Sequence, residues 1–246
     1  MKVWIFHGNF ANRKIIYYRF LFTMRPPEII KTADGSDTLF IRELGEHYHS
    51  TFGAVQESMH VFINAGLRHV EQSELTIFEV GFGTGLNAWI TLSEAFKTNQ
   101  NIRYITVEKY PLSTELWSEL NYPAVLPQYD PEYFRIIHQA EWNKEVKITN
   151  YFSILKLASD LIDVDYSALP LFNLIFFDAF SPDKQPELWE TSVFREISGH
   201  SAQSAIIVTY CAKGAVRRSL TEVGFRAERI PGPPGKREML RGTKNN

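Results

Sequence analysis

Residues 75–87 read LTIFEVGFGTGLN, and this stretch decides the fold. Its first six residues form a short apolar run that is typical of a buried strand. Glycines at positions 81, 83 and 85 follow at once, and a helical pattern begins at Leu86. Glycine lets the backbone turn tightly and approach a ligand closely, while the start of a helix offers free N–H groups. The stretch therefore predicts the ligand-binding beginning of an α/β domain.

The chain beyond this stretch alternates between predicted strands and helices. A final strand pair is expected on either side of a turn rich in Pro and Gly. Strands that alternate with helices predict a Rossmann-like α/β fold with a mostly parallel sheet, here with an antiparallel C-terminal strand. Ligands of such sheets bind at the carboxyl ends of the strands. We expect strands at 102–107, 146–149, 172–177, 205–209, 225–230 and 238–241, and helices at 86–96, 112–121, 131–142, 154–162, 186–197 and 212–223.

The chain divides into three parts by its patterns. The core domain is expected to span residues 71–246. Residues 24–70 are expected to pack on that core, because they carry a short strand pattern and a helical pattern, at 38–41 and 53–66. Residues 1–23 are a possible upstream extension, since Met24 offers a second start.

The composition is that of a globular protein, with 44% hydrophobic and 22% charged residues among 246. No apolar run approaches the roughly 18–20 residues of a membrane span. The single cysteine, Cys211, excludes an intrachain disulfide and argues against a cysteine-based metal site. These features fit a reducing cytoplasm, where we expect the protein to reside.

Positive charge is concentrated near the C-terminus, although the whole chain has a net charge of −2. Residues 211–246 carry nine Lys and Arg against three Glu, whereas the rest of the chain carries 17 Lys and Arg against 25 Asp and Glu. Such a basic face could hold a phosphate backbone, although an ordinary solvated surface explains the excess as well. The candidate contacts are Lys213, Arg217, Arg218, Lys236 and Arg237.

The glycine loop fits two kinds of cofactor site. From Glu79 onward it has an acid-x-Gly-x-Gly-x-Gly spacing, which favours a methyltransferase that uses S-adenosylmethionine. From Gly83 onward it also fits the Gly-x-Gly-x-x-Ala pattern of dinucleotide-binding enzymes. The loop alone does not separate the two. In either case the candidate cofactor contacts are Glu79, Gly81, Phe82, Gly83, Thr84, Gly85 and Asn87.

Two more carboxylates follow predicted strands. Glu108 comes directly after strand 102–107 and can accept hydrogen bonds from both ribose hydroxyls of an adenosine. Asp178 comes directly after strand 172–177, where it could accept a hydrogen bond from an amine, orient it and take its proton. A turn or helix-cap role is the alternative for this residue. The nicotinamide interpretation gives it no clear function, so we predict Asp178 as the catalytic residue of a methyl transfer.

The remaining polar motifs are weaker. The run Glu46-His47-Tyr48-His49 offers two histidines on one strand face but no further ligands, so no metal site is expected. Glu57 lies on the helix before the core, and it could contact substrate or form an ordinary cap or ion pair.

Four separated motifs together resemble one family, over about residues 30–243. It is the methyltransferase half of the bifunctional enzyme that completes 5-methylaminomethyl-2-thiouridine at the tRNA wobble position. The motifs are EVGFGTGLN at 79–87, EKYPL at 108–112, DAFSPDKQPELW at 178–189, and the segment from VRR at 216–218 to GKREML at 235–240.

The resemblance implies methyl transfer from S-adenosylmethionine to the exocyclic aminomethyl nitrogen of a tRNA uridine. It carries cofactor and catalytic roles over to the glycine loop, Glu108 and Asp178, with Asp178 expected to contact the cofactor as well as to act as the catalytic residue. Lys109 is a further candidate cofactor contact, and Phe180 is a candidate substrate contact. Bifunctional relatives have a flavin-dependent domain as well. We expect this chain to be a stand-alone methyltransferase, without flavin or metal, whose substrate is supplied by separate upstream enzymes.

One position departs from the common pattern of such enzymes. Many carry an acidic residue near the adenine amine after the third strand, whereas the expected segment here is Asn150-Tyr151-Phe152. Asn150 could accept that hydrogen bond, and Phe152 could pack on the ring.

Two alternatives to the tRNA assignment stay open at the level of sequence, because fold does not fix substrate. The chain could be a small-molecule amine methyltransferase or an aminopropyl transferase on the same fold. It could also be a cofactor-binding module without catalysis.

Overall fold

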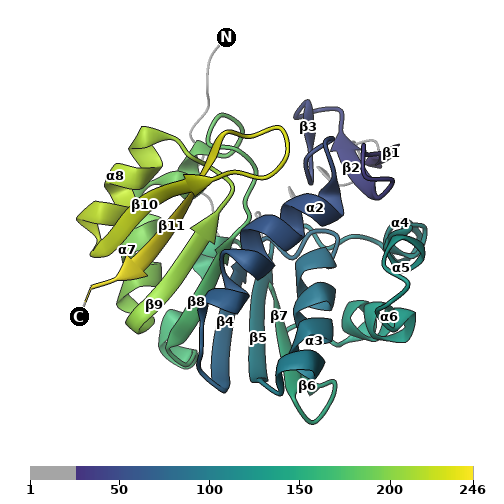
Figure 1. Cartoon of the computed structure of the whole chain (residues 1–246), viewed down its shortest axis with the longest axis horizontal. Coiled ribbons are helices and arrows are strands. Elements are labelled where there is room, and N and C mark those ends of the chain that lie inside the picture. Colours follow the sequence, from purple (N-terminus) through teal and green to yellow (C-terminus); the bar gives the residue numbers. More distant parts are fainter. Residues whose placement is uncertain (1–25, 246) are drawn as a thin grey trace, which may run out of the picture.

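The computed structural model describes residues 26–245, so the proposed extension at 1–23 lies outside the described part. An eight-stranded sheet forms the centre, in the order β10-β11-β9-β8-β4-β5-β7-β6 (Figure 1). The five middle strands from β9 to β7 run parallel, whereas β6 and the β10–β11 pair are antiparallel to their neighbours. The predicted fold is therefore confirmed. The strands are β4 Glu74–Val80, β5 Asn101–Glu108, β6 Glu145–Lys147, β7 Phe152–Ala158, β8 Phe172–Phe177, β9 Ser201–Thr209, β10 Phe225–Pro231 and β11 Glu238–Lys244.

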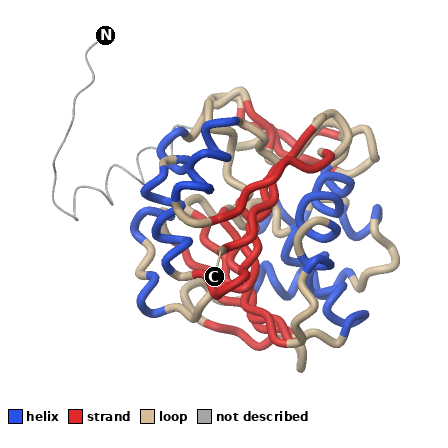
Figure 2. Tube along the Cα trace, turned by 60° about the vertical axis from the view of Figure 1, so that its left-hand side comes forward, coloured by secondary structure: helices blue, strands red, loops and turns tan. Residues whose placement is uncertain are grey.

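Helices cover both faces of this sheet (Figures 1 and 2). Strand β8 shows why: Leu174 and Phe176 belong to one buried apolar cluster, and Ile175 and Phe177 belong to the other. A strand that is apolar on both faces needs helices on both sides. Within residues 26–245, no helix is both long and apolar enough to cross a membrane. The helices of the core are α3 Leu86–Thr98, α4 Thr114–Ser118, α5 Tyr122–Val125, α6 Pro131–Gln139, α7 Thr191–Gly199 and α8 Gly214–Glu222, with a 3-10 turn at Pro186–Trp189 before α7.

The sequence-based prediction was wrong between residues 145 and 162. The expected parallel strand at 146–149 is β6, a three-residue edge strand antiparallel to β7. The expected helix at 154–162 is instead occupied largely by β7, which pairs in parallel with β5. In β7, Phe152, Ile154 and Lys156 are buried in strict alternation, and this period of two belongs to a strand.

The first part of the N-terminal segment lies above the carboxyl ends of the central strands, whereas its helix runs down across one face of the sheet (Figure 1). It contains a three-stranded antiparallel sheet of β1 Glu28–Lys31, β2 Asp37–Ile41 and β3 Glu46–His47. The helix expected at 53–66 is present as α2 Ala54–Ser58, which continues into a π-helical stretch at Met59–Asn64.

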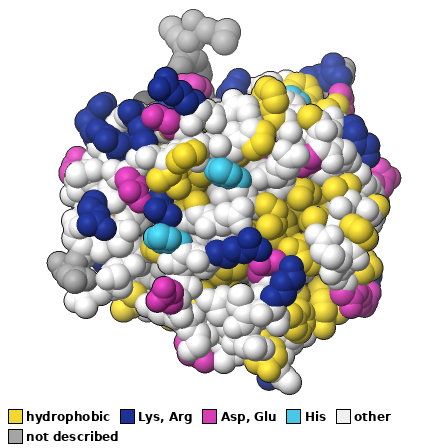
Figure 3. Space-filling model, in the orientation of Figure 1, with side chains coloured by type: hydrophobic (Ala, Val, Ile, Leu, Met, Phe, Trp, Pro, Cys, Tyr) yellow, Lys and Arg dark blue, Asp and Glu magenta, His cyan; other side chains and the backbone are white. Residues whose placement is uncertain are grey.

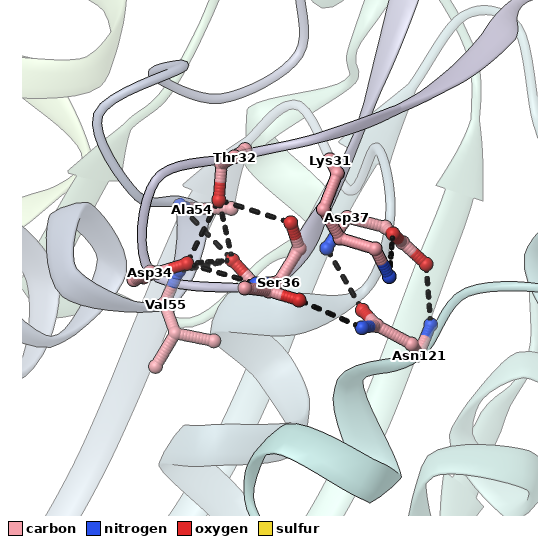
Figure 4. A network of polar contacts seen from close by, with 9 residues as sticks. Lys31, Thr32, Asp34, Ser36, Asp37, Ala54, Val55 and Asn121 are labelled. Carbon is pink, nitrogen blue, oxygen red and sulfur yellow. Dashed lines mark hydrogen bonds and ion pairs between the residues drawn. The ribbon is translucent and has the colours of Figure 1, made fainter.

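Polar contacts join the strands of this segment to α2 and to the core (Figure 4). Ser36 Oγ accepts hydrogen bonds from the backbone N–H groups of Ala54 and Val55, at 3.2 and 3.3 Å, and so caps the first turn of α2. Asp37 and Asn121 exchange two hydrogen bonds of 2.8 and 2.9 Å, which fix the segment to the start of α5. The segment thus forms a fixed roof over the sheet.

Candidate active site

A pocket of about 600 Å³ opens at the carboxyl ends of β4, β5, β7 and β8. Its roof comes from the N-terminal segment, through Ile41, Leu44, Tyr48 and His49. Its volume lies in the range of ordinary small-molecule and cofactor sites. Among the predicted site residues, those that line it are Gly81, Phe82, Gly83, Thr84, Asn87, Glu108, Lys109, Asp178 and Phe180.

The glycine loop forms the floor of the pocket, and its backbone requires glycine. Gly81 has φ +89°, and a Cβ there would lie 2.8 Å from the carbonyl oxygen of Asp178. Gly85 has φ +70° at the N-cap of α3, and a Cβ would lie 2.7 Å from His138 Nε2. A side chain at either position would meet both backbone strain and a close neighbour. The loop therefore packs closely against the residue that follows β8 and against α6, and the pocket lies on its other side.

Glu108 forms one wall at the end of β5. Its Oε2 accepts a hydrogen bond of 3.0 Å from Gly83 N, and its Oε1 accepts one of 2.8 Å from Tyr110 N. Burial raises the pKa of this carboxyl, while the backbone N–H groups oppose that rise. Each oxygen retains acceptor capacity toward the pocket, so the carboxylate suits a pair of vicinal hydroxyls.

Asp160 is a pocket residue that the sequence analysis missed. It follows β7, lines the pocket beside Ser159 and Leu161, and pairs with Lys109. The expected adenine contacts Asn150, Tyr151 and Phe152 lie at the other end of β7, outside this pocket, so that placement was wrong. The error followed from the misplaced strand, because a correct end for β7 would have pointed to Asp160.

Asp178 lies at the end of β8 and is joined to the start of α3. Its Oδ2 accepts a hydrogen bond of 2.8 Å from Asn87 Nδ2. Burial, followed by the charge of Glu57, raises the pKa of Asp178 to about 7, whereas Asn87 and Lys236 act in the opposite direction. A carboxyl of this kind exchanges protons near neutral pH, which suits a general base.

Glu79, predicted as a cofactor contact, lies inside the sheet beneath the pocket. It is fully buried, and its Oε2 accepts a hydrogen bond of 2.8 Å from Thr106 Oγ1. Burial raises the pKa of Glu79 to about 8. Neither Glu79 nor Gly85 lines the pocket: Glu79 lies in β4 beneath the loop, and Gly85 ends the loop at the N-cap of α3.

A second group of charged residues lies near Asp178 but outside the pocket wall. Glu57 is buried in α2, and its Oε2 lies 2.5 Å from Lys236 Nζ. The same ammonium lies 3.9 Å from the ring centroid of Tyr210. Phe180 packs edge-on against Tyr48, with ring centroids 5.1 Å apart, between the roof and the segment that follows β8.

The basic residues near the C-terminus gather on the surface over α8 and the β10–β11 hairpin, at the upper left of Figure 3. Lys213 is the N-cap residue of α8, and Arg217 and Arg218 lie on that helix. Lys213 forms an exposed ion pair of 2.6 Å with Asp183, in the loop that follows Asp178. These residues, together with Arg237, do not line the pocket. Their surface adjoins the segment that carries the catalytic candidate.

The two histidines of the 46–49 run have separate environments. His49 is buried and its Nε2 lies 2.8 Å from Thr84 Oγ1, while the ring of His47 packs on Phe40. Burial lowers the pKa of His49 to about 4, so it is a neutral partner for the glycine loop at physiological pH. Among residues 26–245, no group of three or more His, Cys, Asp or Glu could hold a metal ion.

The sequence is similar to that of known S-adenosyl-L-methionine-dependent methyltransferases. Residues 129–245 match a family described as S-adenosyl-L-methionine-dependent methyltransferase. The tRNA 5-methylaminomethyl-2-thiouridine biosynthesis bifunctional protein MnmC of Pseudomonas savastanoi pv. phaseolicola is 35% identical over 220 residues, which cover 82% of this chain and 32% of that protein. MnmC of Pseudomonas aeruginosa strain UCBPP-PA14 is 32% identical over 224 residues, covering 82% and 33%. The chain thus spans about a third of the length of these curated relatives.

A solved structure resembles the chain over almost its whole length. The crystal structure of MNMC2 from Aquifex aeolicus superposes with a TM-score of 0.73 at 26% sequence identity. The match covers 96% of this chain and 78% of that one.

Proposed function

We propose that this chain, an S-adenosyl-L-methionine-dependent methyltransferase related to MnmC, methylates the exocyclic nitrogen of 5-aminomethyl(-2-thio)uridine at the wobble position of tRNA. The similarity to proteins named for 5-methylaminomethyl-2-thiouridine biosynthesis supports the substrate. The observation that carries the chemistry is the position of Asp178, a partly buried carboxyl on the wall of the pocket that Asn87 holds by a hydrogen bond and whose pKa is raised to about 7.

The pocket fits the cofactor by the chemistry of its walls. Glu108 would hold the two ribose hydroxyls, and Asp160 would accept a hydrogen bond from the adenine amino group. Phe82, Leu112 and Leu161 offer apolar surface for the adenine ring. When bound, S-adenosyl-L-methionine supplies a methyl group on a positively charged sulfur. Because Asp178 and Asn87 line the same pocket as Glu108, the substrate amine and the cofactor would meet there.

Asp178 would prepare the amine for attack. A primary alkyl amine is mostly protonated at neutral pH, since its pKa lies near that of lysine, about 10.4. The Asp178 carboxylate would accept one proton from it, and the freed lone pair on nitrogen would be available to take the methyl group that the bound cofactor would supply, with the neutral thioether as the leaving group. Asn87 holds the carboxylate at 2.8 Å and fixes its orientation.

The basic surface over α8 is the proposed contact for the tRNA backbone. Lys213, Arg217 and Arg218 would contact phosphates, with Arg237 nearby on the hairpin loop. Phosphate contacts position a nucleic acid without reading its sequence, and a flipped wobble base would need an aromatic partner such as Phe180. No flavin or metal enters this proposal, and other enzymes would supply the aminomethyl substrate.

Nucleoside mass spectrometry tests the proposed reaction directly. The protein is incubated with S-adenosyl-L-methionine and tRNA from cells that lack the final methylation. We expect 5-methylaminomethyl-uridine species to appear as the aminomethyl precursor disappears. If cofactor binding is confirmed and no conversion occurs, the tRNA substrate is rejected in favour of a small-molecule amine.

A further inference from the structure

Glu57, Tyr210 and Lys236 form an ammonium-binding group beside the pocket. Lys236 Nζ lies 2.5 Å from a carboxylate oxygen of Glu57 and 3.9 Å from the ring centroid of Tyr210. Glu57 lies in α2, Tyr210 directly follows β9, and Lys236 lies in the loop between β10 and β11. A carboxylate combined with the face of an aromatic ring is a common chemical environment for a protonated amine.

The Glu57 carboxylate is fixed and needs a cation. Its residue is only 4% exposed, and its Oε1 already accepts a hydrogen bond of 3.0 Å from Ser50 N. It therefore cannot turn outward to water without losing a backbone contact. A buried carboxylate without its positive partner is strongly destabilising, so any departure of Lys236 calls for another cation in its place.

Lys236 is the member of this group with access to solvent. It lies in an irregular loop between Pro231 and Glu238, and its side chain is 32% exposed. A lysine side chain has a flexible stem of four carbons, so its ammonium group can move away toward solvent. Tyr210, by contrast, is held by its hydroxyl, which donates a hydrogen bond of 2.9 Å to the carbonyl oxygen of Ala179.

The group adjoins the catalytic candidate. Ala179, which anchors Tyr210, is the residue directly after Asp178. The charges of Glu57 and Lys236 both reach the Asp178 carboxyl, and they shift its pKa in opposite directions. An amine held by Glu57 and Tyr210 would therefore be close to the group that is to take its proton.

We propose that Glu57 and Tyr210 form the recognition site for the protonated primary amine of the substrate, and that Lys236 fills this site until the substrate displaces it. The attachment of that amine to tRNA rests on the proposed function. The ligand class, a primary alkylammonium ion, rests on the contacts of the three residues alone.

The test uses the Lys236→Ala variant of the full chain and propylammonium chloride as the probe. Removing Lys236 should lower the Tm by roughly 5 °C or more, because Glu57 loses its partner. Propylammonium should restore several degrees, whereas sodium chloride at the same ionic strength and neutral propanol should not. Lys213→Ala is the matched control, since it breaks an exposed ion pair and should show no response to the amine.

The double variant E57Q/K236A tests whether the Glu57 carboxylate is the group that binds the amine. It should be insensitive to propylammonium, because the carboxylate that binds the amine is gone. An equal response of K236A and E57Q/K236A would overturn the proposal, and so would the absence of any response in K236A. If K236A does not fold alone, it is purified with propylammonium present, and failure to fold there also counts against the proposal. This assay needs no tRNA. If propylammonium stabilises K236A but the nucleoside assay detects no methylation, the tRNA substrate is rejected and the amine site is retained.

Discussion

The side-chain amide of Asn87 donates a hydrogen bond of 2.8 Å to the carboxylate of Asp178. This contact joins the start of α3, directly behind the glycine loop, to the end of β8. This side-chain hydrogen bond adds to the backbone bond from Asp178 N to the carbonyl oxygen of Val80, and together they position the catalytic candidate relative to the cofactor-binding element. Variants of these two residues separate binding from chemistry.

Replacement of Asp178 by Asn should remove the base and keep the shape. We expect kcat to fall by about 100-fold to 10,000-fold, the usual contribution of a general base. Affinity for S-adenosyl-L-methionine, measured by calorimetry, should stay close to the wild-type value. Loss of cofactor binding together with activity would assign Asp178 to binding instead.

The pH dependence of kcat/KM should follow the ionisation of Asp178. Its pKa is raised to about 7, and only the ionised carboxylate can accept a proton. We therefore expect kcat/KM to fall about tenfold per pH unit below pH 7 and to level off above it. In Asn87→Leu the acid limb should move to higher pH, because the hydrogen bond from Asn87 favours the ionised form. An unchanged limb would show that another group controls the profile.

Glu79 should make the fold less stable as pH rises. Burial raises its pKa to about 8 in the folded protein, from about 4.5, so the folded state holds a proton that the unfolded state has lost between these values. The contribution of Glu79 therefore decreases with pH in this window, with a slope of up to about 1.4 kcal/mol per pH unit. Glu79→Gln should flatten this part of the dependence in urea denaturation at pH 5 and pH 8.5. Parallel curves for the two proteins would contradict the assignment.

Two substitutions, one before and one after β7, test which end of this strand contacts the cofactor. Asp160→Ala should weaken S-adenosyl-L-methionine binding by about tenfold, the loss expected for one hydrogen bond to a charged group. Asn150→Ala is the matched control at the opposite end of the strand and should leave the affinity unchanged. The reverse result would restore the original adenine contacts.

Charge reversal on α8 tests the tRNA surface. The triple variant with Lys213, Arg217 and Arg218 changed to Glu should weaken tRNA binding and reduce its salt dependence, while cofactor affinity is retained. Reversal of Lys144, an exposed residue paired with Glu141, controls for general charge effects. Equal losses in both proteins would show that the surface over α8 has no special role.

Sequence patterns correctly predicted the elements whose local apolar pattern agrees with their pairing in the folded sheet. The glycine loop, Glu108 and Asp178 each follow a strand with a clear apolar run, and all three reach the same pocket. Between 145 and 162 the apolar residues also suit a helix, so the pairing of β7 with β5 decided the outcome. Asp160 was missed for this reason. The contact of Glu57 with Lys236 joins residues far apart in sequence, and no local pattern predicts it.

That long-range contact has a consequence for biosynthesis. The Glu57–Lys236 pair spans 179 positions, and Asp37 and Asn121 are separated by 84. Because a ribosome releases the chain from its N-terminus, the roof and the glycine loop are made long before the hairpin loop that neutralises Glu57. The nascent protein therefore carries the Glu57 carboxylate without its lysine partner until the loop between β10 and β11 has been made, and the site is completed only after that loop emerges.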